Sequence, residues 1–204
     1  MHATRLACCL GLVYVSWTVW CVLMISVGAP FDQPIPRAVF RFAAFMVPAL
    51  VYMWSSEPKD LLRLRLTTNW RSGLTVGIVV AGAWAMLHAT QNFRLPNAAH
   101  AWVNVITLSP IAEEILFRCI VLERLLTWTS ASRAIILSAV LFSLIHLPWW
   151  WISGQKPAAE IAQLLGVMFA YGVVFGILYH RTRSIWASLL PHSMNNLIAE
   201  SLVH

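Results

Sequence analysis

Long apolar runs, separated by short polar connections, dominate this chain. A helix that crosses the hydrocarbon core of a bilayer needs about 20 mostly apolar residues. Windows of that kind lie at residues 6–26, 38–54, 72–91, 101–122, 134–151, 161–179 and 185–203. The pattern predicts an all-α transmembrane helical bundle of about seven spans. The connections are too short to hold a soluble domain, so we expect residues 1–204 to form a single integral membrane domain.

The composition also indicates a membrane protein. Of the 204 residues, 59% are hydrophobic and 11% are charged, and the mean hydropathy is +0.71. Soluble domains usually contain about 25% charged residues. Cysteine is present at positions 8, 9, 21 and 119, without the spacing of metal ligands. We give these cysteines no catalytic role, and we expect no cofactor.

The positively charged residues predict the orientation of the chain. Cytoplasmic loops carry an excess of Lys and Arg, and this rule favours a cytoplasmic N-terminus. That orientation places nine such residues on the cytoplasmic side (Arg5, Lys59, Arg63, Arg65, Arg71, Arg124, Arg133, Arg181 and Arg183) and four outside (Arg37, Arg41, Arg94 and Lys156). The formal net charge of +6 predicts contact with anionic membrane lipids, and nothing in the sequence suggests nucleic acid.

Three ionisable residues interrupt the fourth apolar window, in the stretch EEILFR. Charged side chains inside a membrane are costly and indicate function by default. Glu114 and Arg118 are four residues apart on a helix and can form an ion pair. Glu113 is rotated from Glu114 by about 100°, so we expect it to lack a local partner. One glutamate is then structural and the other is free to act.

Two further windows carry polar or aromatic residues one helical turn apart. Phe142 and His146 lie in FSLIH, and His192 and Asn196 lie in HSMNN. At about 1.5 Å per residue, Glu113, His146 and His192 reach depths of roughly 12 to 18 Å from the expected cytoplasmic ends of their helices. Residues from three separate helices are therefore expected at a similar level, where they could meet.

A carboxylate and imidazoles at one buried level suit the hydrolysis of a peptide bond. Glu113 and His146 could hold and deprotonate a water molecule. The imidazole of His192 and the amide of Asn196 could donate to the oxyanion that forms when water attacks a carbonyl. Phe142 could fix the imidazole of His146 and exclude water, although a phenylalanine taken alone is more often part of an apolar core.

These residues resemble motifs of a known family. EEILFR fits EExxxR, FSLIH fits FxxxH and HSMNN fits HxxxN, in that order along the chain. The pattern is similar to that of the CPBP family, the CAAX proteases and bacteriocin-processing (Abi) proteins, which include the type II CAAX prenyl endopeptidases. The resemblance covers about residues 98–200, and three motifs in order are far more specific than any one of them.

The resemblance implies a metal-independent intramembrane glutamate endopeptidase. By motif position, the catalytic residues would be Glu113, His146, His192 and Asn196, and the supporting residues would be Glu114, Arg118 and Phe142. The implied partner is a membrane-associated or lipid-anchored protein or peptide substrate. We expect a multi-pass protein of the bacterial cytoplasmic membrane, and the sequence does not specify its oligomeric state.

Other classes of function remain open on the residues alone. A proton-coupled transporter would also bury Glu, Arg and His, although no internal repeat is visible. A zinc protease could use Glu113, His146 and His192 as ligands, although the chain lacks an HExxH helix. A non-enzymatic membrane scaffold or immunity protein could retain Glu114 and Arg118 for helix packing alone.

Overall fold

The structure, a computed structural model, describes residues 2–28, 34–55, 65–91, 94–97 and 101–202. Every regular element within these ranges is a helix, as the apolar pattern predicts. The elements are α1 (His2–Ser26), α2 (Pro34–Ser55), α4 (Trp70–His88), η1 (Ala101–Leu108), α5 (Ser109–Glu114), η2 (Ile115–Leu122), α6 (Glu123–Leu126), α7 (Ala131–Leu144), α8 (Leu147–Ser153), α9 (Ala158–Thr182) and α10 (Trp186–Leu202).

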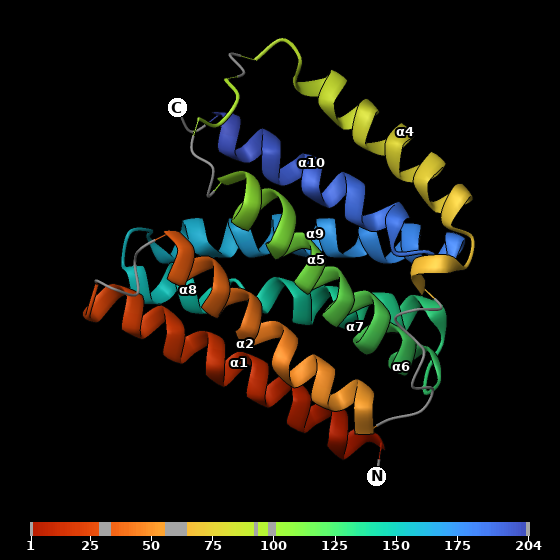
Figure 1. The fold of residues 1–204 in the computed structure, drawn as a ribbon, viewed down its shortest axis with the longest axis horizontal. Coiled ribbons are helices and arrows are strands. Elements are labelled where there is room, and N and C mark those ends of the chain that lie inside the picture. Colours follow the sequence, from red (N-terminus) through yellow and green to blue (C-terminus); the bar gives the residue numbers. More distant parts are fainter. Residues whose placement is uncertain (1, 29–33, 56–64, 92–93, 98–100, 203–204) are drawn as a thin grey trace.

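The helices form a bundle whose central members carry the three motifs. Figure 1 shows α1 and α2 side by side along one side of the bundle and α4 with α10 on the opposite side. The elements α5, α7 and α9 lie between these two pairs. Helix α2 packs on α5 and η2, and α1 packs on α8. The N-terminal pair therefore lies against the segments that carry EEILFR and against the helix that directly follows FSLIH.

Five helical segments within the described ranges are long and apolar enough to cross a membrane. They are Ala3–Ser26, Ile35–Ser55, Trp70–His88, Ala131–Ser153 and Ala158–Thr182. The other two predicted windows are also helical, but α10 has only 17 residues and the helix over 101–126 carries the ionisable residues. The chain is thus a polytopic transmembrane helical protein, while the number of spans and their orientation remain predictions.

Two of the helices depart from regular α geometry beside the motifs. The segments η1 and η2, on either side of α5, are π-helical, and π turns often occur at functional sites. The window 134–151 is not one continuous helix, because α7 ends at Leu144 and α8 begins at Leu147. Pro148 lies in the first turn of α8, where its missing N–H is tolerated. The intervening turn contains His146.

Small residues allow α4 to lie close against α10. A Cβ atom on Gly77 would lie 2.5 Å from the backbone oxygen of Trp186, which is closer than real Cβ contacts. Gly73 faces Ser184 just as tightly. Interfaces between membrane helices favour such small residues because they let two backbones approach. This packing holds α10, with its HSMNN motif, against the rest of the bundle.

Candidate active site

Glu114 and Arg118 form the buried ion pair that their spacing predicts. Nε of Arg118 lies 3.0 Å from Oε2 of Glu114, and both side chains are fully buried. The Arg118 guanidinium also lies over the ring of Phe142, 4.9 Å from its centroid. Removing one member of such a pair would leave an uncompensated charge in the interior. Through Phe142, the pair links η2 to α7.

Glu113 has partners that its own motif does not reveal. Its Oε1 accepts a hydrogen bond from Ser109 at 2.6 Å and one from Arg41 at 3.2 Å. The expectation that Glu113 lacks a local partner is therefore wrong for Oε1. Its other oxygen, Oε2, is buried and accepts no hydrogen bond from any described residue. One side of this carboxylate is held in place, and the other remains available to a further donor.

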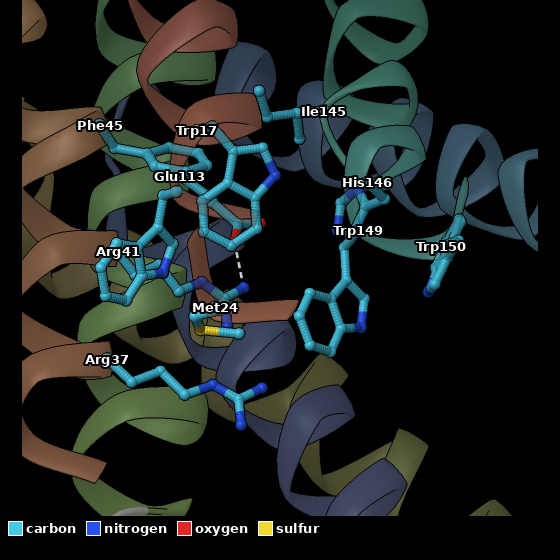
Figure 2. A pocket seen from close by; sticks show the side chains of 11 residues that line it. Trp17, Met24, Arg37, Arg41, Phe45, Glu113, Ile145, His146, Trp149 and Trp150 are labelled. Atoms are coloured by element: carbon cyan, nitrogen blue, oxygen red, sulfur yellow. Dashed lines mark hydrogen bonds and ion pairs between the residues drawn. The ribbon is translucent and has the colours of Figure 1, made fainter. Parts of the chain in front are cut away.

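Arg41 is a site residue that the sequence analysis misses. We expected it among the charges outside the membrane, but it lies within α2 and pairs with Glu113 (Figure 2). Its guanidinium also lies 5.4 Å from the ring centroid of Trp17. Its position inside the apolar window 38–54 was the available signal, because an arginine inside a span usually has a partner.

His192 lies between the two glutamates. Its Nδ1 is 3.0 Å from Oε1 of Glu114, and its Nε2 is 3.7 Å from Oε2 of Glu113. An ionised carboxylate only accepts hydrogen bonds, so the first contact assigns a proton to Nδ1. The ring stacks on Phe175 at a centroid distance of 5.0 Å. Carboxylates and aromatic packing together fix the orientation of this imidazole.

The break between α7 and α8 determines how His146 is oriented. Its backbone N–H donates to Ser143, so the carbonyl of Phe142 is left for the side chain. Nδ1 of His146 lies 3.0 Å from that carbonyl oxygen. Because a carbonyl only accepts, Nδ1 carries the proton and the neutral ring has its lone pair on Nε2. His146 thus has the tautomer that a base requires.

A cavity of about 300 Å³ joins the motif residues. Glu113, His146, His192 and Asn196 all line it. Asn196 donates a hydrogen bond to the backbone oxygen of Val105 at 2.8 Å, which orients its amide and leaves a second N–H. A space of this size holds several water molecules or part of a peptide. The structure therefore brings the four predicted catalytic residues to the wall of one cavity.

Phe142 lies behind the two histidines. It is 1% exposed, and its ring makes edge contacts with His146 at 5.3 Å and with His192 at 5.7 Å between centroids. It also underlies the Arg118 guanidinium. Phe142 therefore contacts His146, His192 and Arg118 as well as filling the core.

Comparisons with known proteins show the family to which the chain belongs. A family model described as type II CAAX prenyl endopeptidase Rce1-like matches residues 95–198, about half of the chain. The fold is that of a polytopic membrane protein in which polar motif residues line one cavity. The chain belongs to the Rce1-like family, which confirms the predicted resemblance to the CAAX proteases.

A relative from Bacillus subtilis (strain 168) carries the name "Putative membrane peptidase YdiL" and is 34% identical over 89 residues. That match covers 44% of this chain and 31% of the relative. The similarity thus spans under a third of the relative's length.

Proposed function

We propose that this protein is an intramembrane endopeptidase that cleaves a peptide bond with water activated by Glu113 and His146. The observation that carries the proposal is the buried Oε2 of Glu113, which accepts no hydrogen bond from the described part of the chain and lies beside a cavity that His146 also lines. An unpaired carboxylate oxygen is costly to bury, and a bound water would satisfy it. Membership of the Rce1-like family and the similarity to the named membrane peptidase support the same class of activity.

The proton transfers follow from the orientation of the two groups. Water donates one hydrogen bond to Oε2 of Glu113 and another to Nε2 of His146, where the lone pair lies. As the water oxygen bonds to the peptide carbon, its proton passes to this pair and the carbonyl oxygen becomes an oxyanion. When the carbon–nitrogen bond breaks, the same proton passes to the leaving amine. Proton transfer by positioned groups of this kind contributes about 10²–10⁴-fold to the rate.

His192 and Asn196 are proposed to donate hydrogen bonds to the oxyanion. Asn196 has one amide N–H that is not used by Val105. His192 would donate through Nε2, which requires a ring protonated on both nitrogens. The Glu114 carboxylate, 3.0 Å from Nδ1, and the Glu113 carboxylate, 3.7 Å from Nε2, would both stabilise that charge, and Arg118 holds Glu114 in place. Preorganised donors of this kind are worth about 10²–10³-fold each.

The substrate is proposed to be a membrane-associated or lipid-anchored protein or peptide. A cavity inside a helical bundle favours segments that reach it by lateral diffusion in the membrane. We also propose that residues 1–204 act as one integral membrane domain, because Trp17 and Arg41 from the first two helices line a cavity that Glu113 shares. An efficient cleavage of a soluble, unanchored peptide would contradict the preference for membrane-associated substrates.

The test compares membrane proteomes. Cells that produce the wild-type protein or its Glu113→Gln variant at equal levels are analysed by mass spectrometry for new peptide ends. We expect a set of ends that requires the wild-type protein and is missing with Glu113→Gln. A matched control is Glu160→Gln, which removes an acid that pairs with Lys156 away from the cavity. Equal peptide ends with wild type and Glu113→Gln would refute the proposal.

The same cleavage assay distinguishes glutamate chemistry from zinc chemistry. The described residues contain no group of three or more His, Cys, Asp or Glu placed to hold a metal ion. We propose that no metal takes part, so cleavage should continue in the presence of a strong chelator. Inhibition by the chelator that zinc then restores would instead assign the site to a metalloprotease.

A further inference from the structure

The indole of Trp17, on α1, carries a hydrogen-bond donor with no acceptor among the described residues. The side chain is 7% exposed, and its Nε1 is buried. An indole N–H can only donate. A buried donor without an acceptor costs free energy, and a buried tryptophan usually has a partner for this group. The donor is therefore available to an acceptor on a bound molecule.

The ring of Trp17 is held in place without the use of its N–H. Phe45 makes an edge contact with it at 5.7 Å between ring centroids, and the Arg41 guanidinium lies 5.4 Å from the ring centroid. Arg41 is itself paired with Glu113. These contacts orient the indole before any ligand arrives, and such preorganisation lowers the cost of binding.

The indole lies beside the candidate active site. Trp17 lines a cavity of about 80 Å³ whose wall also contains Glu113 and His146. Both of these residues line the larger cavity as well, so a chain bound across Glu113 can occupy the two spaces together. Figure 2 shows the indole nitrogen on the edge of the ring that is turned toward the side where Ile145 and His146 lie.

The nearby acceptors on Glu113 and His146 have other uses. Oε1 of Glu113 accepts from Ser109 and Arg41. Oε2 of Glu113 and Nε2 of His146 would hold the attacking water under the proposed function. Trp17 forms a hydrogen bond with none of these atoms. An extended peptide, in contrast, brings a new carbonyl oxygen about every 3.3 Å, and each buried carbonyl needs a donor.

We propose that Nε1 of Trp17 donates a hydrogen bond to a backbone carbonyl of the bound substrate. This carbonyl differs from that of the bond to be cleaved, because the proposed oxyanion donors His192 and Asn196 line the larger cavity and are not among the described residues of the smaller one. A contact with the main chain does not depend on the substrate's side chains. Trp17 would therefore align the peptide over Glu113 for substrates of different sequence.

The role of this contact rests on the proposed function, but the contact itself can be measured without cleavage. The purified full chain with ¹⁵N-labelled tryptophan is placed in neutral-lipid nanodiscs. The probe is N-myristoyl-Leu-Ala-Leu-Ala amide, whose anchor gives the uncharged peptide a high effective concentration at the protein. If the probe is cleaved, the Glu113→Gln chain takes the place of the wild type. We expect the indole N–H signal of Trp17 to move downfield when the probe is added and to stay in place with myristyl alcohol, which lacks the peptide.

Two replacements assign the signal and test the contact. Trp17→Phe keeps an aromatic ring and removes the N–H, and benzothienylalanine at position 17 keeps the bicyclic shape without the N–H. Each should weaken binding of the probe by about 2–10-fold, the value of one hydrogen bond. Each should also reduce the preference for the probe over an analogue with ester bonds in place of its three inner peptide bonds, since ester carbonyls are weaker acceptors.

Trp84→Phe is the matched control. Nε1 of Trp84 is also buried without an acceptor among the described residues, but Trp84 is not among the described residues that line either cavity, so its variant should bind as the wild type does. Thermal unfolding shows whether each chain is folded, and the benzothienylalanine chain decides the outcome if Trp17→Phe does not fold. A Trp17 signal that the probe leaves in place, wild-type affinity without the N–H, or no binding of the probe would each overturn the contact.

The outcomes also separate the contact from the proposed function. Cleavage in cells together with an unmoved Trp17 signal would leave the protease and remove the contact. A peptide that binds through Trp17, without any cleavage in cells, would leave the contact and remove the protease. A Trp17 signal that lies downfield before the probe is added, and does not change afterwards, would assign the N–H to bound water and show the proposed contact to be wrong.

Discussion

Replacing Glu113 or Glu114 by glutamine makes the same chemical change at adjacent positions. We expect Glu113→Gln to lose cleavage activity and keep most of its stability, and Glu114→Gln to lose much of its stability. In Glu113→Gln the amide oxygen can still accept from Ser109 and Arg41, and the new NH₂ group takes the place of an oxygen without a partner. Each retained hydrogen bond weakens by about 1 kcal/mol when its acceptor loses charge. Arg41 also loses its balancing charge, but its side chain is 22% exposed, so this costs less than leaving a fully buried guanidinium unpaired. We therefore expect a change in unfolding free energy of no more than about 2 kcal/mol.

Catalysis should respond far more strongly than stability at position 113. The variant lacks the base that accepts the proton of water, so kcat should fall by about 10³-fold. This is about 4 kcal/mol of transition-state stabilisation at 1.36 kcal/mol per factor of ten. KM should change little, because the side chain keeps its shape.

Glu114→Gln should instead unfold more easily. It leaves the fully buried guanidinium of Arg118 without a balancing charge and also removes the carboxylate that holds Nδ1 of His192. Breaking a buried pair in this way costs about 3–5 kcal/mol. The assay is thermal unfolding of both variants in the same detergent, with cleavage of a substrate from the proteome comparison measured in parallel. Wild-type cleavage by Glu113→Gln, or equal unfolding of the two variants, would refute the division of roles between the glutamates.

Three further predictions follow from single contacts. Asn196→Ala should lower kcat by about 10²–10³-fold with little change in KM, because it removes a proposed hydrogen-bond donor to the oxyanion. An unchanged kcat in steady-state kinetics would contradict that role. Gly77→Ala should lower the thermal unfolding temperature, since its Cβ would collide with the Trp186 backbone. In the matched control Gly82→Ala, the new Cβ has nothing within 4 Å, so the free energy of unfolding should rise by up to about 1 kcal/mol. Equal effects of the two glycine variants on stability would rule out close packing of α4 on α10.

Much of the architecture can be predicted from the sequence because local patterns determine it. The apolar windows predict the helices, and the four-residue spacing predicts the Glu114–Arg118 pair that the structure contains. The three motifs predict the residues around the larger cavity. Their catalytic roles remain predictions, since the structure describes where these side chains lie and not what they do.

The features that were missed depend on contacts between distant segments. Arg41 and Glu113 are 72 residues apart, and no spacing rule joins them. The placement of His192 between both glutamates depends on how α10 packs against α5. The break before His146 is signalled only weakly by Pro148, because a proline in the first turn of a helix is also compatible with an uninterrupted span.

The wall contributed by α1 and α2 lies outside residues 95–198, the region that the family model matches. Under the proposed function, the matched region would supply the motif residues, while α1 and α2 would supply Arg41 and part of the surface that contacts the substrate. Homologues that share EEILFR-type motifs but differ in their first two helices should then perform a common reaction on different targets. Exchanging those helices between two such homologues, with the arginine at position 41 kept, should then move selectivity from one to the other while leaving turnover intact.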